Sequence, residues 1–324
     1  MSLVLGVDSG GTKTLAALAD RSGCVVSLIR CPSLDPSAND RWQASLAELV
    51  GRMPQLAAVS AAALGLPFHG EIDAYSTEQV RVARALLPVE PVVDNDVRIA
   101  FDGAFAGESG ALILSGTGSM AWASLNGAND PQIRVGGWGD AFGDEGSAFW
   151  VGRESLACIS RELDGRSSET SFSAEFLRRL DLRPTELMAW CYALQNRRRE
   201  FAGLATVTAE LAETGDPTAR RIMHKAADAL AETLLVAWRL AAGDRPLRWS
   251  FAGGMTTSSV VMQRIRERVG CEPTARRLPP IGGALYRAAV HARWEVTPAW
   301  LECVNASLHE FPAYVEQRNQ EARN

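Results

Sequence analysis

Apolar residues along the chain fall into short runs that are separated by clusters of glycine, serine and charged residues. Three such runs near the start, Leu3–Val7, Leu15–Ala19 and Cys24–Ile29, are divided by turn residues and predict an antiparallel meander of three strands. Apolar positions at helical spacing then predict a helix over residues 40–52. A run of small apolar residues predicts a buried strand over residues 57–66.

A second helix and strand follow. Ser76 or Thr77 is expected to cap a helix that continues through Leu87, and residues 90–93 form the next expected strand. The order strand, strand, strand, helix, strand, helix, strand is then complete before a new hairpin begins at Ala111. This order predicts an α/β fold.

The second half has its own meander, which begins with the hairpin at Ala111, and then a helical insertion at about residues 148–245. Within it, Asp216 and Pro217 form a favourable N-cap and first-turn pair. One face of the following helix is apolar, with Ile222, Ala226, Leu230, Leu234 and Trp238. The remaining expected elements are a strand over 247–252, a helix from about Thr256, a helix over 281–291 and a helical tail from Thr297.

Two glycine-rich turns carry the clearest chemical signal, one in each of the domains that we expect at residues 1–107 and 108–324. Each turn lies between two apolar runs, so each is predicted to be the tip of a β-hairpin. Glycine lets the backbone approach an anion closely, and converging N–H groups suit phosphate oxygens. The pair predicts a duplicated domain that holds a polyphosphate from both sides; the alternative is two ordinary turns. The tips are Gly10, Gly11, Thr12 and Lys13 in the first domain and Gly116, Thr117 and Gly118 in the second.

Other phosphate-binding motifs do not fit these turns. A Walker loop places lysine directly after the second glycine and a helix behind it. Here Thr12 separates Gly11 from Lys13, and the next residues predict a strand. The second turn fits a loose dinucleotide pattern, but that pattern must open a helix, and the apolar run after it is soon broken by Asn126-Gly127.

Asp94, Asn95 and Asp96 lie where an apolar strand ends and a helix is expected to begin at Val97. The carboxyl ends of parallel strands face the ligand crevice in open α/β sheets. An aspartate there can take the proton from a substrate hydroxyl as its oxygen attacks phosphorus. The alternative is a helix cap. We expect one of the acids to be catalytic, with Asp96 the first choice.

Two further glycine-rich segments are candidates for ligand binding. Residues 136–147 combine five glycines with Trp138, Phe142 and several carboxylates, and sugar sites are built from such aromatic and acidic side chains. The alternative for this segment is a long solvated loop. Gly253 and Gly254 follow a predicted strand, where either a close approach to a flat ring or ribose or a plain turn would explain them.

Composition narrows the class of protein. The 324 residues carry a net charge of −5, which gives no footprint for nucleic acid or an anionic membrane. The arginines at 197–199 predict a solvated helix end. Six dispersed cysteines predict buried, reduced thiols. No apolar run has the length of a membrane span, and the start of the chain does not match a signal peptide. We therefore expect a soluble, cytoplasmic protein.

Taken in order, the motifs resemble the N-acetylglucosamine kinase branch of the hexokinase, actin and sugar-kinase superfamily, which also holds the BadF/BadG/BcrA-type activator ATPases. The resemblance extends from Leu3 to about Ala289. It implies two ribonuclease-H-like (actin-like ATPase) domains around a central cleft that binds a sugar and Mg-ATP, and a homodimer. The motifs are G-x-D-S-G-G-T-K-T, N-D, L-S-G-T-G-S, G-G-W-G-x-x-x-G-D-E-G-S-A-x-W and A-G-G.

The resemblance also implies roles for single residues. Asp8 would position Mg²⁺ through water, the two glycine turns would bind the phosphates of ATP, and Gly253 and Gly254 would lie by the adenosine. Asp96 matches the catalytic base that deprotonates the sugar 6-hydroxyl. The residues that match sugar contacts are Asn39, Asp144 (a ring hydroxyl) and Gly137, Trp138 and Gly139 (the N-acetyl group).

The function implied is ATP-dependent phosphorylation of the 6-hydroxyl of an amino sugar, with N-acetylglucosamine the first choice. Met120 departs from the resemblance, because animal N-acetylglucosamine kinases carry an asparagine there that reaches the sugar. Glucosamine and N-acetylmuramic acid are therefore alternative substrates. A non-sugar activator ATPase is a further alternative, although the cysteines here do not match its iron–sulfur site.

Overall fold

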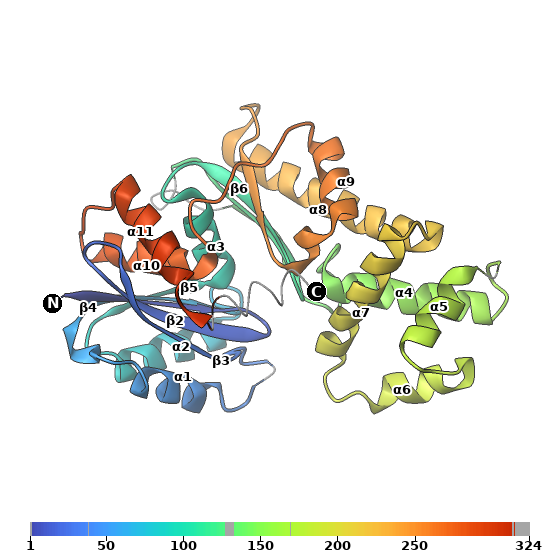
Figure 1. Cartoon of the computed structure of the whole chain (residues 1–324), viewed down its shortest axis with the longest axis horizontal. Helices are drawn as coiled ribbons and strands as arrows, with labels where there is room; N and C mark the ends of the chain where they lie inside the picture. Colours follow the sequence, from blue (N-terminus) through green and yellow to red (C-terminus); the bar gives the residue numbers. More distant parts are fainter. Residues whose placement is uncertain (1, 38, 127–132, 169, 313, 315–324) are drawn as a thin grey trace. The chain divides into compact units, whose positions relative to one another are not determined.

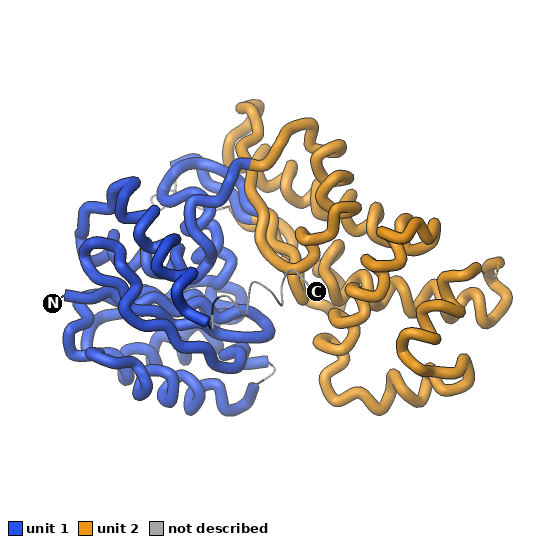
Figure 2. Tube along the Cα trace, viewed as in Figure 1, with its two compact units in different colours: residues 1–112, 122–132, 274–320 blue, residues 113–121, 133–273, 321–324 orange. Residues whose placement is uncertain are grey.

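The computed structural model describes residues 2–37, 39–126, 133–168, 170–312 and 314. The chain forms two compact units (Figure 2). Unit 1 contains residues 1–112, 122–132 and 274–320, and unit 2 contains residues 113–121, 133–273 and 321–324.

Unit 1 is built on a five-stranded sheet of order β3-β2-β1-β4-β5 (Figure 1). The first three strands form the expected antiparallel meander, whereas β4 and β5 run parallel to β1. Parallel neighbours need a crossover, and helices α1 and α2 supply it. The predicted order of strands and helices is confirmed. The bounds are β1 (Leu3–Ser9), β2 (Lys13–Asp20), β3 (Val25–Pro32), α1 (Trp42–Gly51), η1 (Leu56–Ala58), β4 (Val59–Leu66), α2 (Asp73–Leu86) and β5 (Pro91–Asn95).

Helices cover both faces of this sheet, because successive strand residues point to opposite sides. On β1, Leu3 and Leu5 pack in the core formed with α1 and α2, whereas Val4 packs in the core formed with α10 and α11. Helix α3 also packs against α10 (Figure 1). These three helices are α3 (Asp96–Phe105), α10 (Pro280–His291) and α11 (Pro298–Leu308).

The return of α10 and α11 to unit 1 distinguishes the compact units from the continuous division expected at residues 1–107 and 108–324. Ile281 and Leu285 of α10 and Trp300 of α11 are buried in the core on one face of the first sheet. Their apolar side chains lie far from that sheet in sequence, so only tertiary packing reveals where they belong.

The second sheet has four strands in the order β8-β7-β6-β9, and a series of helices lies between β8 and β9. Helix α8 begins as predicted, because the Asp216 carboxylate accepts the N–H groups of Thr218 and Ala219, both at 2.9 Å. The bounds are β6 (Gly110–Ser115), β7 (Ser119–Ser124), β8 (Ile133–Gly136), α4 (Ala148–Leu163), α5 (Ser171–Arg179), η3 (Pro184–Glu186), α6 (Leu187–Ala193), α7 (Arg197–Glu213), α8 (Pro217–Ala242), β9 (Trp249–Ala252), η4 (Gly254–Thr257) and α9 (Ser259–Val269).

Two predicted helix starts are wrong by a few residues. Helix α2 begins at Asp73, and the Ser76 hydroxyl donates to the Ile72 carbonyl over 3.0 Å, so Ser76 belongs to the first turn. Helix α9 begins at Ser259, because a 3₁₀ turn occupies the segment around Thr256.

The cysteines and the long helices were also subjects of sequence predictions. All six cysteines are free thiols, but they are partly exposed, whereas we expected them to be buried. None of the helices among the described residues is both long and apolar enough to span a membrane. The end of the predicted tail, residues 315–324, lies outside the described residues.

Candidate active site

The first glycine turn joins β1 to β2 in unit 1. The Gly10 N–H donates to the Lys13 carbonyl over 3.0 Å and closes the turn. The Ser33 hydroxyl donates to the Gly10 carbonyl over 2.6 Å, which ties the turn to the segment after β3. Gly11 and Thr12 at the tip are exposed. Strand β1 precedes the turn and strand β2 follows it, as predicted. The exposed backbone of this tip is suited to an anion.

The parallel strands of unit 1 bring carboxylates to one edge of the sheet. Asp8 on β1 lies opposite Gly65 on β4, and Gly65 lies opposite Asp94 on β5. A Cβ placed on Gly65 would lie 2.6 Å from the Ile99 side chain and 3.3 Å from the Asp96 Cα. Because Gly65 has no side chain, the start of α3 packs directly on β4. Asp96 therefore lies at the strand edge that also carries Asp8.

The three side chains at the junction of β5 and α3 make different contacts. The Asn95 side chain caps α3 by accepting the Val97 N–H over 3.0 Å. The Asp94 carboxylate accepts a hydrogen bond of 2.7 Å from Arg287. Asp96 also accepts the Val97 N–H, over 2.9 Å, but among the described residues it forms no ion pair. Asn95 is the N-cap residue of α3, whereas Asp96 accepts the same N–H without a cationic partner among the described residues. The catalytic role of Asp96 stays a prediction.

The pKa of Asp96 is raised to about 8. Burial is the main cause, since it removes the water that would solvate the negative charge. The charges of Asp8, Glu71 and Asp35 raise this pKa further, and the hydrogen bond from Val97 opposes them. Titratable groups with strongly raised pKa values gather at functional sites.

Asp35 and Glu71 are members of this acidic cluster that sequence reasoning missed. Asp35 is buried and accepts two hydrogen bonds from Ser37, through its N–H and its hydroxyl. Glu71 accepts a hydrogen bond of 2.8 Å from the Asn95 amide. Neither residue lies in a glycine-rich or strand-end motif, so the sequence carried no local signal for them.

Asn39 lies in the segment between β3 and α1. Its amide donates to the Ser33 carbonyl over 3.0 Å, and its side-chain oxygen accepts the Arg41 N–H over 3.0 Å. These bonds fix the backbone of the segment that follows Ser33, the residue whose hydroxyl bonds to the first glycine turn. The sugar contact of Asn39 stays a prediction.

The second glycine turn joins β6 to β7. The Gly116 N–H donates to the Gly118 carbonyl over 2.9 Å, and the Gly116 carbonyl accepts the N–H of Ala148, the first residue of α4, over 2.8 Å. Gly253 has φ +97°, and a Cβ there would collide with the backbone of Ser115. The Gly253-Gly254 turn therefore lies against the start of the second glycine turn, which the separate motifs did not reveal.

Asp144 lies against the same turn. It is only 3% exposed and has φ +55°, a conformation that residues other than glycine rarely adopt. Its carboxylate accepts the Ser119 N–H and lies 3.0 Å from an Arg198 nitrogen. Burial raises the pKa of Asp144, and the positive charge of Arg198 opposes that rise. A Cβ on Gly118 would lie 2.8 Å from the Asp144 Oδ2.

The glycine-rich segment after β8 presents its aromatic rings to solvent. Trp138 is 68% exposed and Phe142 is 74% exposed. Gly137 and Gly139 have φ +70° and +83°, which only glycine adopts readily. Met120 is buried and packs against Gly137. The two rings are solvated, as the alternative interpretation required, and the Arg134 guanidinium lies over the Trp138 ring at 5.9 Å from its centre.

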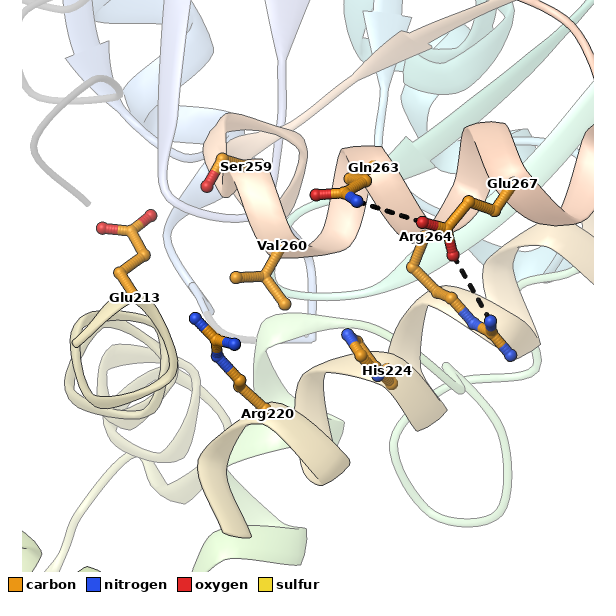
Figure 3. A pocket seen from close by; sticks show the side chains of 8 residues that line it. All are labelled: Glu213, Arg220, His224, Ser259, Val260, Gln263, Arg264 and Glu267. Carbon is orange, nitrogen blue, oxygen red and sulfur yellow. Dashed lines mark hydrogen bonds and ion pairs between the residues drawn. The ribbon is translucent and has the colours of Figure 1, made fainter. Parts of the chain in front are cut away.

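A cavity of about 530 Å³ lies between α7, α8 and α9 in unit 2 (Figure 3). Glu213 of α7 and Arg220 and His224 of α8 face Ser259 of α9 across it. The cavity is polar, and Glu267 accepts a hydrogen bond of 3.1 Å from Gln263. The other lining residues are Val260 and Arg264.

The predicted residues therefore gather into two groups, one in each unit. Within the described residues, no set of three or more His, Cys, Asp and Glu side chains is arranged to hold a metal ion. The group in unit 1 is Asp8, Gly10, Gly11, Thr12, Lys13, Asn39 and Asp96, and the group in unit 2 is Gly116, Thr117, Gly118, Gly137, Trp138, Gly139, Asp144, Gly253 and Gly254.

Two curated proteins are similar in sequence. The N-acetylmuramic acid/N-acetylglucosamine kinase of Clostridium acetobutylicum is 27% identical over 235 residues, which cover 70% of this chain and 76% of that protein. The N-acetyl-D-glucosamine kinase of Dictyostelium discoideum is 30% identical over 147 residues, which cover 44% of this chain and 45% of that protein.

Solved structures share the fold. A candidate N-acetylglucosamine kinase from Chromobacterium violaceum matches with a TM-score of 0.72 and 23% identity, over 88% of this chain and 98% of that one. A ROK family glucokinase from Streptomyces griseus matches with a TM-score of 0.55 and 19% identity, over 89% and 99%. These likenesses, together with the two sheets, show the two-domain ribonuclease-H-like fold of sugar kinases. Residues 5–286 match the BadF/BadG/BcrA/BcrD ATPase family, and the chain belongs to that family.

Proposed function

We propose that the protein is an ATP-dependent kinase that phosphorylates the 6-hydroxyl of an amino sugar, with N-acetylglucosamine as the first candidate. The observation that carries the proposal is the Asp96 carboxylate, which begins α3 directly after the parallel strand β5, at the sheet edge that also carries Asp8, and forms no ion pair among the described residues. The similarity to two proteins named as kinases of such sugars supports it.

The two glycine turns are proposed to bind the phosphates of ATP. Backbone N–H groups at each tip would meet the phosphate oxygens, and Lys13 would add a positive charge. The contact between Gly253 and the second turn supports a nucleotide that extends from that turn towards the Gly253-Gly254 backbone. The residues proposed for ATP are Gly10, Gly11, Thr12, Lys13, Gly116, Thr117, Gly118, Gly253 and Gly254.

A magnesium ion fits the chemistry of unit 1. Three carboxylates, those of Asp8, Glu71 and Asp35, are close enough to raise the pKa of Asp96, and this surplus of negative charge favours a divalent cation with oxygen ligands. When bound, the ion supplies positive charge to the phosphates. We propose that Asp8 positions it through water, because Mg²⁺ usually keeps several waters and takes only one or two carboxylates besides phosphate.

Asp96 is proposed to act as the general base. Its carboxylate accepts the proton of the sugar hydroxyl, the hydroxyl oxygen bonds to the γ-phosphorus, and the bond from that phosphorus to the oxygen bridging to ADP breaks. With a pKa of about 8, Asp96 must first lose its own proton. Positive charge brought near it favours this ionisation. Proton abstraction of this kind contributes about 10²–10⁴-fold to the rate.

Three parts of the chain are proposed to contact the sugar. Asp144 would accept a ring hydroxyl, Asn39 would bind the sugar, and the exposed loop Gly137-Trp138-Gly139 would contact the N-acetyl group. Met120, packed under Gly137, offers no amide to that group. N-acetylmuramic acid is therefore the second candidate, since the Clostridium acetobutylicum relative is named for both sugars.

A coupled assay of ADP release tests the proposal. N-acetylglucosamine, N-acetylmuramic acid, glucosamine and N-acetylmannosamine are each added with Mg-ATP. A kinase releases ADP only when its sugar is present. ADP release that is the same with and without every sugar would instead identify an activator-type ATPase.

The homodimer and the cytoplasmic location stay predictions.

A further inference from the structure

The three consecutive arginines at 197–199 have different environments. Arg199 is exposed, and the Arg197 guanidinium lies over the Tyr192 ring at 4.8 Å from its centre. The side chain of Arg198 is 26% exposed and contacts two aspartates. The solvated helix end that we expected from the sequence is therefore wrong for Arg198.

Arg198 extends from the start of α7 to the second glycine turn. One terminal nitrogen lies 3.0 Å from the Asp144 Oδ2, and its Nε lies 3.4 Å from the Asp140 Oδ1. A Cβ placed on Gly118 would lie 3.0 Å from that same terminal nitrogen. The guanidinium and the Asp144 carboxylate thus cover Gly118 together, and all four residues belong to unit 2.

This placement solves an electrostatic problem. Asp144 is buried beside a turn proposed to bind polyphosphate. An unpaired carboxylate there would repel the phosphates and would itself be costly to keep ionised. Asp140 adds a second negative charge on the same loop. Arg198 faces both carboxylates and supplies the compensating positive charge.

We propose that Arg198 is a positioning residue that holds the Asp144 carboxylate in place beside the second glycine turn and neutralises it there. This inference rests on the proposed function, in which Asp144 accepts a hydroxyl of the sugar. Asp144 can then bind the sugar while phosphate binds to the neighbouring backbone. Arg198 acts through Asp144 and takes no part in the proton transfer at Asp96.

The test is the steady-state kinetics of Arg198→Gln and Arg198→Lys between pH 6 and pH 9, with Arg199→Gln as the matched control. In Arg198→Gln, Asp144 loses its positive partner, so its pKa rises and a protonated fraction appears near neutral pH. We expect the sugar KM to rise about tenfold to a hundredfold at pH 6–7 and to recover as the pH increases. Arg198→Lys keeps the positive charge but loses the guanidinium that contacts both aspartates. We expect it to show a smaller rise in the sugar KM, with the same pH dependence. Arg199→Gln is expected to match the wild type.

Three results would overturn the inference. The first is a sugar KM of Arg198→Gln equal to that of Arg199→Gln. The second is a KM of Arg198→Gln that is raised equally at every pH, because a distorted loop, and not an ionisation, has that effect. Should Arg198→Gln not fold, a wild-type KM in Arg198→Lys at every pH would have the same meaning. If one of these results is obtained while the wild type releases ADP with an amino sugar, this inference fails and the proposed function stands. A wild type that phosphorylates none of the sugars removes both.

Discussion

At the scale of single residues, the neighbouring side chains of Asp94, Asn95 and Asp96 make different contacts. Sequence reasoning placed a catalytic acid within Asp94–Asp96 but could not separate it from a helix cap. In the structure Asn95 caps α3 and Asp94 pairs with Arg287, whereas Asp96 forms no ion pair among the described residues. The catalytic role of Asp96 stays a prediction. Asp35 could not have been predicted, since it reaches the cluster only after folding.

The raised pKa of Asp96 predicts a dependence of stability on pH. A carboxyl with a pKa of about 8 in the folded protein and an ordinary value of 3.8 holds its proton more tightly when folded. The folded state therefore binds more protons between these values, and its stability falls as the pH rises through this range. Because asparagine does not titrate, Asp96→Asn removes this fall in stability with rising pH. In metal-free buffer without nucleotide, we expect its melting temperature to exceed that of the wild type by a margin that grows from pH 5 to pH 9.

Asp244→Asn, at an exposed position, is the control for that comparison. It is expected to follow the wild type at every pH. Equal pH profiles for Asp96→Asn and the wild type would show that Asp96 ionises as readily as an exposed aspartate.

At the scale of elements, the start of α3 is held by its packing on β4 and α10. A Cβ on Gly283 of α10 would collide with the Ile99 carbonyl and would lie 2.5 Å from the Gly103 nitrogen of α3. The two helices thus meet backbone to backbone. Arg287 of α10 adds hydrogen bonds to Asp94 and, over 2.9 Å, to Asp102. Hydrophobic spacing predicted that these helices exist, but not that they touch.

Gly283→Ala tests this packing. We expect a loss of about 1–3 kcal/mol in the free energy of unfolding, because the added methyl group must push α3 and α10 apart. Urea denaturation of the purified protein measures it. Gly203→Ala in α7 is the contrasting control, since a Cβ there meets nothing within 4 Å. Alanine should stabilise that helix by about 0.5–1 kcal/mol. Equal effects of the two substitutions would contradict the close contact.

At the scale of the whole molecule, the candidate residues are divided between two compact units. The order of strands and helices in residues 1–107 could be predicted from the sequence, because alternation and turn residues are local signals. The membership of residues 274–320 in unit 1 could not, because it follows from packing across most of the chain. Both glycine turns could be predicted as hairpin tips, whereas the contact of Arg198 with the second turn and the contact of Glu71 with Asn95 could not.

The transfer of labelled γ-phosphate from ATP to N-acetylglucosamine, by the wild type and by Asp96→Asn, tests the central claim most directly. The account predicts a labelled sugar 6-phosphate from the wild type. It predicts transfer about 10²–10⁴-fold slower from Asp96→Asn, with sugar affinity, measured by calorimetry, within about threefold. Wild-type transfer rates in Asp96→Asn, or label released only as free phosphate by the wild type, would contradict it.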